Sequence, residues 1–156
     1  MMRLLATFFV LVPLLIDYFS KKYIENNFDT HAIILNDFII IDKTYNKGIA
    51  FSLFNFDSPL TNIFFSIIVI FIIAIIINFV LKNFSTFNKL EFFAWNIVIG
   101  AAIANLIDRI TNGSVLDFII IHYENIYFPA IFNFADAFIS LGVFLLIINY
   151  FIYKND

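Results

Sequence analysis

The chain has no cysteine, and among its 156 residues there are only two histidines, four glycines and three prolines. The absence of cysteine excludes disulfides, thiolate metal ligands and a cysteine nucleophile. Charged residues are also scarce, at 13% against 62% hydrophobic residues, and the net charge is −3. A nucleic-acid-binding protein needs a concentrated basic surface, so no nucleic acid partner is expected. The composition is that of an integral membrane protein.

Four apolar stretches are expected to span a membrane, at about residues 4–22, 60–81, 90–108 and 134–153. Stretch 60–81 is apolar on every side, and at 1.5 Å per residue it reaches about 33 Å, enough to cross the hydrocarbon core. No internal repeat or low-complexity linker divides the chain. The sequence therefore predicts a single domain over residues 1–156, an all-α membrane fold built as a bundle of four transmembrane helices.

The start of the chain imitates a secretory signal peptide, because Arg3 precedes an apolar run. No small-residue cleavage site follows, and the chain continues as IDYFSKKYIENN, so we expect the first span to be retained. Lysine and arginine are denser in the short segments 1–3, 82–89 and 154–156 than in the longer segments on the other side, although the raw count does not favour them. The density places both termini in the cytoplasm.

The first outer loop has the character of β-structure. Its apolar stretches HAIILNDFIIID (31–42) and GIAFSLF (48–54) flank the polar KTYNKG. This pattern predicts a small strand pair with a turn at residues 46–48, where glycine permits a positive φ. The second outer stretch, 110–131, is also partly apolar and is expected to lie along the membrane surface.

Familiar hydrolytic sites are missing or weak. The two histidines, His31 and His122, lie in different loops and no H-E-x-x-H motif is present, which argues against a zinc peptidase and predicts no metal site. A serine–lysine dyad stays open as an alternative, because the outer side holds Ser20, Ser52, Lys21 and Lys47. Ser20 and Lys21 are neighbours in the chain, however, and adjacent side chains on a helix point apart.

Carboxylates and amides remain at the ends of the spans. Asp17 and Lys21 are four residues apart, in the acid-first order that favours an ion pair on a helix. The favoured interpretation of this pair is an ion pair at the surface that fixes the depth of the helix.

One face of the third span is small and polar. Ala101, Ala104, Asn105 and Asp108 share this face, and Arg109 follows at the water boundary. Gly100 and Ala104 add a small-x-x-x-small spacing, which lets another helix approach closely. From the spacing alone, the face is equally well explained as polar helix packing.

Two further aspartates, Asp117 and Asp136, lie outside the same membrane face and are close enough along the chain to meet. Taken singly, Asp117 is equally explained as a loop acid. Asp136 is equally explained as a helix-start acid, because Asn133 is a natural N-cap that places Asp136 at the third helical position. A close pair of carboxylates tends to share one proton near neutral pH. One carboxylate then activates water while the other polarises a carbonyl, which is peptide hydrolysis without a metal.

Five motifs in order make the chain resemble lipoprotein signal peptidase, the signal peptidase II family of bacterial aspartyl peptidases. The family's D-Q-x-[ST]-K is present as DYFSK (17–21), and its N-x-G-x-A-F-S as NKGIAFS (46–52). Its G-G-A-x-G-N-x-x-D-R is present as GAAIANLIDR (100–109), and V-x-D-F and F-N-x-A-D as residues 115–118 and 132–136. Each motif alone is weak, whereas five in order over nearly the whole chain are specific.

The chain departs from the family pattern at three positions. Tyr18 replaces the family glutamine, which puts a polar role at that position in doubt. Ala101 and Ala104 replace two glycines, so close packing is expected to survive with slightly less room for a substrate helix.

The resemblance implies an aspartic endopeptidase that cuts a prolipoprotein just before a cysteine carrying diacylglycerol. It implies that Asp117 and Asp136 are catalytic and that no cofactor or metal takes part. The residues that it implies bind substrate or support the site are Asn46, Gly48, Asn105, Asp108, Arg109, Asn133, Asp17 and Lys21. It places the enzyme in the bacterial inner membrane with both termini cytoplasmic and the site on the outer face. Membrane lipids and the prolipoprotein are the expected partners, and we expect a monomer.

Two other classes of membrane protein fit the composition. A small proton-coupled transporter also uses paired carboxylates, but it predicts polar residues deep in several spans. The amides of stretch 60–81, Asn62 and Asn78, lie near its ends, and the acids gather at one membrane face. A membrane scaffold without enzymatic activity would need no acid pair. The motif series favours the peptidase over both.

Overall fold

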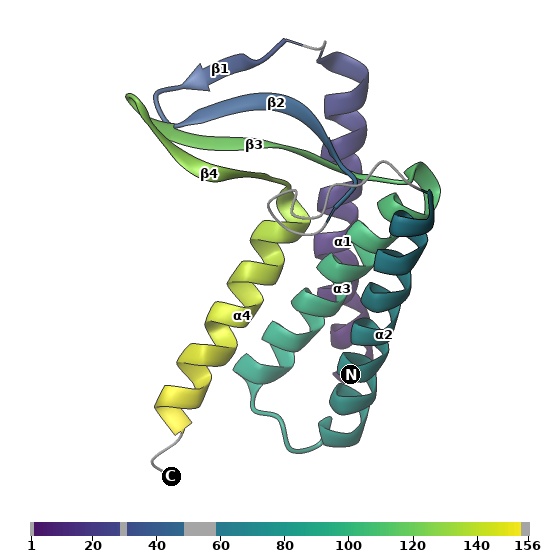
Figure 1. The fold of residues 1–156 in the computed structure, drawn as a ribbon. Helices are drawn as coiled ribbons and strands as arrows, with labels where there is room; N and C mark the ends of the chain where they lie inside the picture. Colours follow the sequence, from purple (N-terminus) through teal and green to yellow (C-terminus); the bar gives the residue numbers. More distant parts are fainter. Residues whose placement is uncertain (1, 29–30, 49–58, 154–156) are drawn as a thin grey trace.

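The computed structural model describes residues 2–28, 31–48 and 59–153. Within them are four helices long and apolar enough to cross a membrane, as the sequence predicts. They are α1 (Met2–Asn27), α2 (Pro59–Asn83), α3 (Lys89–Asn112) and α4 (Phe134–Tyr153). The helices form one layer of the molecule and a small sheet lies across one end of them, while both termini lie at the opposite end (Figure 1).

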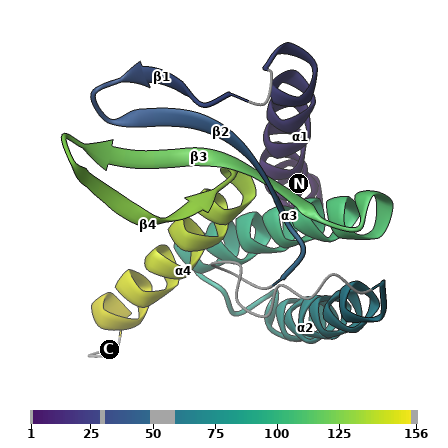
Figure 2. The same ribbon diagram turned by 45° about the horizontal axis from the view of Figure 1, so that its top comes forward.

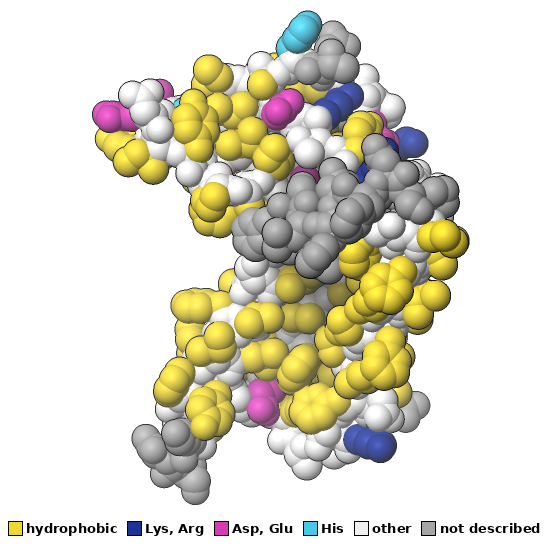
Figure 3. All heavy atoms as spheres, viewed as in Figure 1, with side chains coloured by type: hydrophobic (Ala, Val, Ile, Leu, Met, Phe, Trp, Pro, Cys, Tyr) yellow, Lys and Arg dark blue, Asp and Glu magenta, His cyan; other side chains and the backbone are white. Residues whose placement is uncertain are grey.

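The third helix is the centre of the bundle. It packs against each of the other three helices, and Figure 2 shows α1, α2 and α4 arranged around it. Half of the residues in its most apolar stretch are buried, against 17–22% in the corresponding stretches of the other helices. On the face drawn in Figure 3, hydrophobic side chains cover the helices, and charged side chains gather near the sheet and at the opposite end. This banding suits a protein whose middle lies in hydrocarbon.

Two glycines let helix backbones meet closely. A Cβ at Gly100 would lie 2.1 Å from the carbonyl oxygen of Val10, so α1 contacts the backbone of α3 there. A Cβ at Gly142 would lie 2.4 Å from Cγ2 of Val98 and 3.0 Å from the carbonyl oxygen of Ala94. Small residues at such crossings are the usual means by which membrane helices pack without a hydrophobic driving force.

The sheet has four antiparallel strands in the order β1-β2-β3-β4. They are β1 (Ile33–Asn36), β2 (Ile39–Asn46), β3 (Val115–Tyr123) and β4 (Ile126–Phe132). A buried cluster of Ile24, Ile41, Leu116 and Phe118 joins the end of α1 to the two middle strands. The sheet is therefore attached to the bundle by apolar packing as well as by the chain connections.

A strand pair is present in the first outer loop, as expected, but it lies earlier in the chain than the predicted pair. Residues 46–48, where a turn is predicted, follow directly after the end of β2, and the strand expected beyond them lies outside the described residues. The strands reverse at residues 36–39, where Oδ1 of Asn36 accepts the N–H groups of Phe38 and Ile39, each at 2.9 Å. Hydrogen bonds between an asparagine side chain and nearby backbone N–H groups favour a turn over a continuing strand. Of the stretch 48–54, only Gly48 falls within the described residues.

The second outer stretch is not a simple surface segment. Residues 115–132 form a β-hairpin that pairs with β2 and doubles the number of strands. Its turn places Glu124 at a φ of 50°. The hairpin matters for the site because it pairs Asp117 of β3 with Thr44 of β2.

Candidate active site

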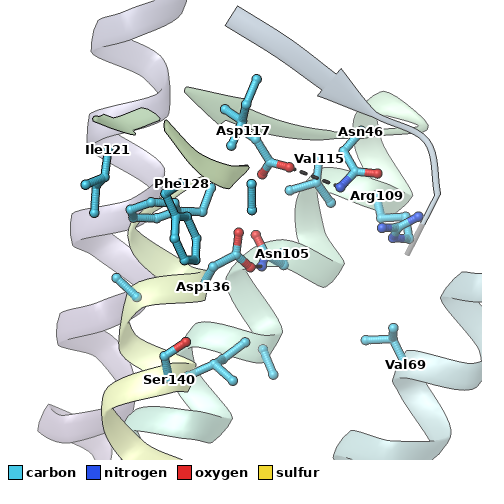
Figure 4. A pocket seen from close by; sticks show the side chains of 16 residues that line it. Asn46, Val69, Asn105, Arg109, Val115, Asp117, Ile121, Phe128, Asp136 and Ser140 are labelled. Atoms are coloured by element: carbon cyan, nitrogen blue, oxygen red, sulfur yellow. Dashed lines mark hydrogen bonds between the residues drawn. The ribbon is translucent and has the colours of Figure 1, made fainter. Parts of the chain in front are cut away.

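A cavity of about 620 Å³ lies under the sheet, between α3 and α4, with Val69 of α2 on its far side. Its polar end is formed by Asp117 and Asp136 with their neighbours, while most of its remaining wall is apolar (Figure 4). Ligand sites are typically built this way, from an apolar wall and a few convergent polar groups.

Asp117 lies near the start of β3 and is almost fully buried, at 4% exposure. The amide of Asn46 donates to its Oδ2 at 3.0 Å, and the amide of Asn133 donates to its Oδ1 at 2.7 Å. Burial, and after it the nearby charge of Asp136, raise the pKa of Asp117 to about 6. The two amide bonds and the charge of Lys21 act in the opposite direction. Asp117 is therefore a carboxyl group that holds its proton unusually far toward neutral pH.

Asp136 is the third residue of α4, and the expected helix cap is confirmed. The backbone N–H of Asp136 donates to Oδ1 of Asn133 at 2.9 Å. In return, the backbone N–H of Asn133 donates to Oδ2 of Asp136 at 3.3 Å. This is a capping box with an aspartate in place of the usual glutamate. Asn105 on α3 donates to the other carboxylate oxygen of Asp136 at 2.8 Å.

Asn133 links the two aspartates. Its side chain is completely buried and bonds the carboxylate of Asp117, while its backbone N–H bonds the carboxylate of Asp136. Its amide also lies 3.2 Å from Oδ1 of Asn105. A helix cap, a strand residue and a residue of α3 are thereby held in one network around the two acids.

Asp17 and Lys21 do not form the surface ion pair that the sequence favours. They are 1% and 4% exposed, because α3 covers this side of α1. The ammonium group of Lys21 lies 2.5 Å from Asp17 and 2.8 Å from Asp108, and it donates to Oδ1 of Asn105 at 3.0 Å. Oδ1 of Asp17 accepts the N–H of Ala135 at 2.8 Å. The pair is thus a buried junction between α1, α3 and α4.

Arg109 attaches the end of β2 to α3. Its guanidinium donates to the carbonyl oxygen of Gly48 at 2.8 Å, and the N–H of Gly48 donates to Oδ1 of Asn46 at 3.0 Å. Because Oδ1 of Asn46 accepts the N–H of Gly48, the NH2 group of the same amide is the end that faces Asp117. The second guanidinium nitrogen, Nη1, is buried and has no hydrogen-bond partner within the described chain.

All ten residues singled out in the sequence lie in one connected set of hydrogen bonds and ion pairs. The serine–lysine alternative finds no support, because the hydroxyl of Ser20 donates to the carbonyl of Asp17 while Lys21 is held by carboxylates. Ser52 lies outside the described residues. In the described ranges, no group of three or more histidine or acidic residues could hold a metal ion.

The sequence reasoning missed several residues of the cavity wall, including two that are labelled in the close view. Phe128 of β4 and Ser140 of α4 both line the cavity (Figure 4). Phe128 could not be placed without the hairpin. Ser140 follows Asp136 by four residues, and the spacing rule for one helix face would have found it.

The arrangement has the parts of a metal-free hydrolytic site. A carboxyl group whose pKa is raised toward neutral lies in one network with a second carboxyl group, and both face a cavity large enough for a peptide. One group serves as a general base and the other as a hydrogen-bond donor to a carbonyl oxygen.

Comparison with known proteins agrees with this chemistry. The family profile described as Signal peptidase (SPase) II matches residues 9–152. The lipoprotein signal peptidase of Wigglesworthia glossinidia brevipalpis is 39% identical, with 95% of each chain covered. That of Cellvibrio japonicus is 38% identical, covering 90% of this chain and 82% of its own. A solved structure described as a bacterial membrane enzyme superposes with a TM-score of 0.79 at 25% identity, covering 94% of this chain and 87% of that one.

Proposed function

The chain belongs to the signal peptidase II family, and we propose that Asp117 and Asp136 are its catalytic pair. Family membership makes it a protease that removes signal peptides from prolipoproteins, and the family implies an aspartic mechanism. The observation that carries the assignment is the bridge by Asn133, which bonds both carboxylates at the polar end of the cavity. No other pair of acids among the described residues lines that cavity.

The proposed substrate is a prolipoprotein whose cysteine carries diacylglycerol, with cleavage just before that cysteine. The mostly apolar wall of the cavity suits an apolar signal helix, and its polar end suits the bond to be cut. Nη1 of Arg109, which has no hydrogen-bond partner among the described residues, is a donor at this end that a substrate carbonyl can accept. Membrane lipids surround the four helices, and a monomer suffices because one chain supplies the whole site.

In the proposed reaction Asp136 is the general base. It lies at the first turn of α4, where the helix N–H groups stabilise a carboxylate. Asp136 takes a proton from water, and the oxygen of that water attacks the carbonyl carbon of the scissile bond. Protonated Asp117 donates a hydrogen bond to the carbonyl oxygen, on which negative charge develops. When the C–N bond breaks, the proton held by Asp136 passes to the leaving amine of the cysteine.

The supporting residues divide into two groups by position. Asn46 and Gly48 hold Asp117 from the strand side, and Arg109 secures Gly48. Asn105 holds Asp136 from the helix side and is itself bonded by Lys21. Asp17 and Asp108 neutralise the buried charge of Lys21. We assign them positioning rather than catalytic roles.

Both termini are proposed to be cytoplasmic, with the site on the outer face of the bacterial membrane. The termini and the connection between α2 and α3 share one end of the bundle, and the sheet lies at the other (Figure 1). Asp117 in β3 and Asp136 in the first turn of α4 belong to the end with the sheet. The short segments at the end with the termini are the ones denser in lysine and arginine.

The test is cleavage of a diacylglyceryl-modified prolipoprotein by the purified protein in detergent. Asp117→Asn and Asp136→Asn preserve side-chain shape and remove the acid. We expect both variants to fold and to lose at least about a thousandfold in kcat, because a mechanistic acid or base is removed outright. Asp37→Asn, at an exposed acid in the β1–β2 turn, is the matched control and should cleave normally. Near-normal cleavage by either site variant would overturn the assignment.

A further inference from the structure

Ser140 stands one helical turn from Asp136 on the same side of α4. The two residues are four apart in the chain, so their side chains share a face and are separated by about 6 Å along the axis. Figure 4 shows Ser140 facing the same cavity as Asp136, farther from the sheet. It therefore lies on the side of the acid pair that is deeper in the membrane.

The hydroxyl of Ser140 is not satisfied by its own helix. Ser66 and Thr111 both donate to the carbonyl oxygen one turn earlier, each at 2.8 Å, as helical serines and threonines commonly do. Ser140 makes no such bond to Asp136, nor any other hydrogen bond within residues 2–28, 31–48 and 59–153. Most of the other residues that line the cavity are apolar, among them Ala102, Ala137 and Ile139. A donor is thus presented to the cavity away from its polar end.

A signal peptide brings unpaired acceptors to this depth. The last four carbonyl groups of a helix have no partner within it, and a peptide that is opened for hydrolysis leaves still more carbonyls free. In hydrocarbon there is little water to satisfy them, and each unpaired polar group costs several kcal/mol. A hydroxyl in the wall next to the scissile bond meets this need.

We propose that Ser140 Oγ–H donates a hydrogen bond to a main-chain carbonyl of the signal peptide, about two residues before the scissile bond. The position follows from the distance along α4, since an extended chain advances about 3.3 Å per residue. Because the contact is to the main chain, it positions the peptide without selecting a side chain. The inference rests on the proposed function, and it makes Ser140 a positioning residue for the substrate.

The first test compares kcat/KM of Ser140→Ala, Ser140→Thr and wild type on the lipidated prolipoprotein. Loss of one hydrogen bond to a peptide predicts a fall of about fivefold to tenfold for Ser140→Ala. Ser140→Thr keeps the hydroxyl and should stay within about twofold of wild type. Ser66→Ala is the matched control, a serine in another span whose hydroxyl is satisfied by its own helix, and it should not change the rate.

The second test identifies the acceptor. Synthetic lipopeptide substrates carry a single thioamide at the second, third or fourth carbonyl before the cleavage site, and sulfur accepts hydrogen bonds poorly. For wild type, one of these substrates should be cleaved about fivefold to tenfold more slowly than the all-amide peptide. For Ser140→Ala the same thioamide should cause no further loss, which is the signature of coupled groups.

Two results would overturn the inference. Equal kcat/KM for Ser140→Ala and wild type is one, and equal sensitivity of both proteins to every thioamide is the other. Either result leaves the acid pair intact if Asp117→Asn and Asp136→Asn remain inactive. Failure of the wild type to cleave the lipidated substrate overturns the proposed function, and this inference with it.

Discussion

Asp17 on α1 accepts the backbone N–H of Ala135, the residue immediately before Asp136, at 2.8 Å. The two residues are 118 positions apart in the chain. The first four N–H groups of a helix lack partners within the helix, and Asp17 supplies one from another helix. The start of α4, and with it the position of Asp136, is therefore fixed by α1.

Loss of Asp17 should weaken both stability and activity. Asp17→Ala removes the acceptor for Ala135 and one counter-charge of the buried Lys21, so we expect a loss of about 3 kcal/mol in stability. Asp17→Asn keeps an oxygen for the N–H and should be less harmful. The measurements are thermal unfolding in detergent and cleavage rate, with Asp37→Asn as the exposed control. Equal stability of all three variants and wild type would contradict this account of α4.

The pH dependence of cleavage should report Asp117. In the proposed mechanism Asp117 acts in its protonated form, and its pKa is raised to about 6. The rate should therefore fall as the pH rises through that value. Asn46 donates to the charged form and so lowers the pKa of Asp117, which means that Asn46→Ala should move the falling limb to higher pH.

The pH experiment measures kcat/KM for wild type and Asn46→Ala across the range in which the protein stays folded. Asn27→Ala is a suitable control, because this exposed asparagine at the end of α1 bonds only the carbonyl of Tyr23. A limb that stays in place or moves to lower pH in Asn46→Ala would show that Asn46 does not stabilise the charged form. The acids are coupled, so the limb belongs to the pair rather than to one residue.

The charge of Asp117 should also cost stability. Its pKa is about 6 in the folded protein against an ordinary 3.8, so the folded state holds its proton more tightly than the unfolded chain does. Stability from this group is thus lost as the pH rises from about 4 through about 6, by at most about 3 kcal/mol. Asp117→Asn should remove this loss. Urea or thermal unfolding at pH 4 and pH 8 should show a smaller difference for the variant than for wild type.

The two close helix crossings should respond differently to one added methyl group. At Gly100 the methyl of alanine would meet the backbone of Val10, which has no side-chain rotation to relieve the clash. At Gly142 the nearest atom is a methyl group of Val98. Gly100→Ala should therefore destabilise the protein more than Gly142→Ala does, each by at least about 1–3 kcal/mol. Val98→Ala should partly rescue Gly142→Ala and leave Gly100→Ala unaffected, as measured by thermal unfolding.

The helical part of the fold could be read from the sequence because hydrocarbon imposes a length and a composition on each span. The N-cap at Asn133 could also be read, since capping depends on residues three apart. The predicted C-terminal ends of the first and third spans differ from those in the structure. The third helix continues to Asn112, where Gly113 adopts a φ of 72° and closes it, rather than ending near residue 108. The first continues to Asn27, five residues beyond the expected end.

The sheet and the buried charges could not be read in the same way. Strand pairing between β2 and β3 joins residues about 70–80 positions apart, and local pattern carries no record of such pairing. The spacing of Asp17 and Lys21 predicts an ion pair, but burial depends on Asp108, which comes from another helix. The grouping of the site residues was available only through the resemblance, because single acids at span ends have equally good local explanations.

The first helix, α1, resembles a signal peptide in composition but differs from one in its contacts. Its apolar run after Arg3 has the composition of the very segments that signal peptidases II remove. Its outer end, however, carries Asp17 and Lys21, whose partners lie on α3 and α4. A cut anywhere after Lys21 would take away the counter-charge of Asp108 and the support of the first turn of α4. A member of a family that removes leader sequences thus packs its own leader-like segment against the residues proposed to form its active site.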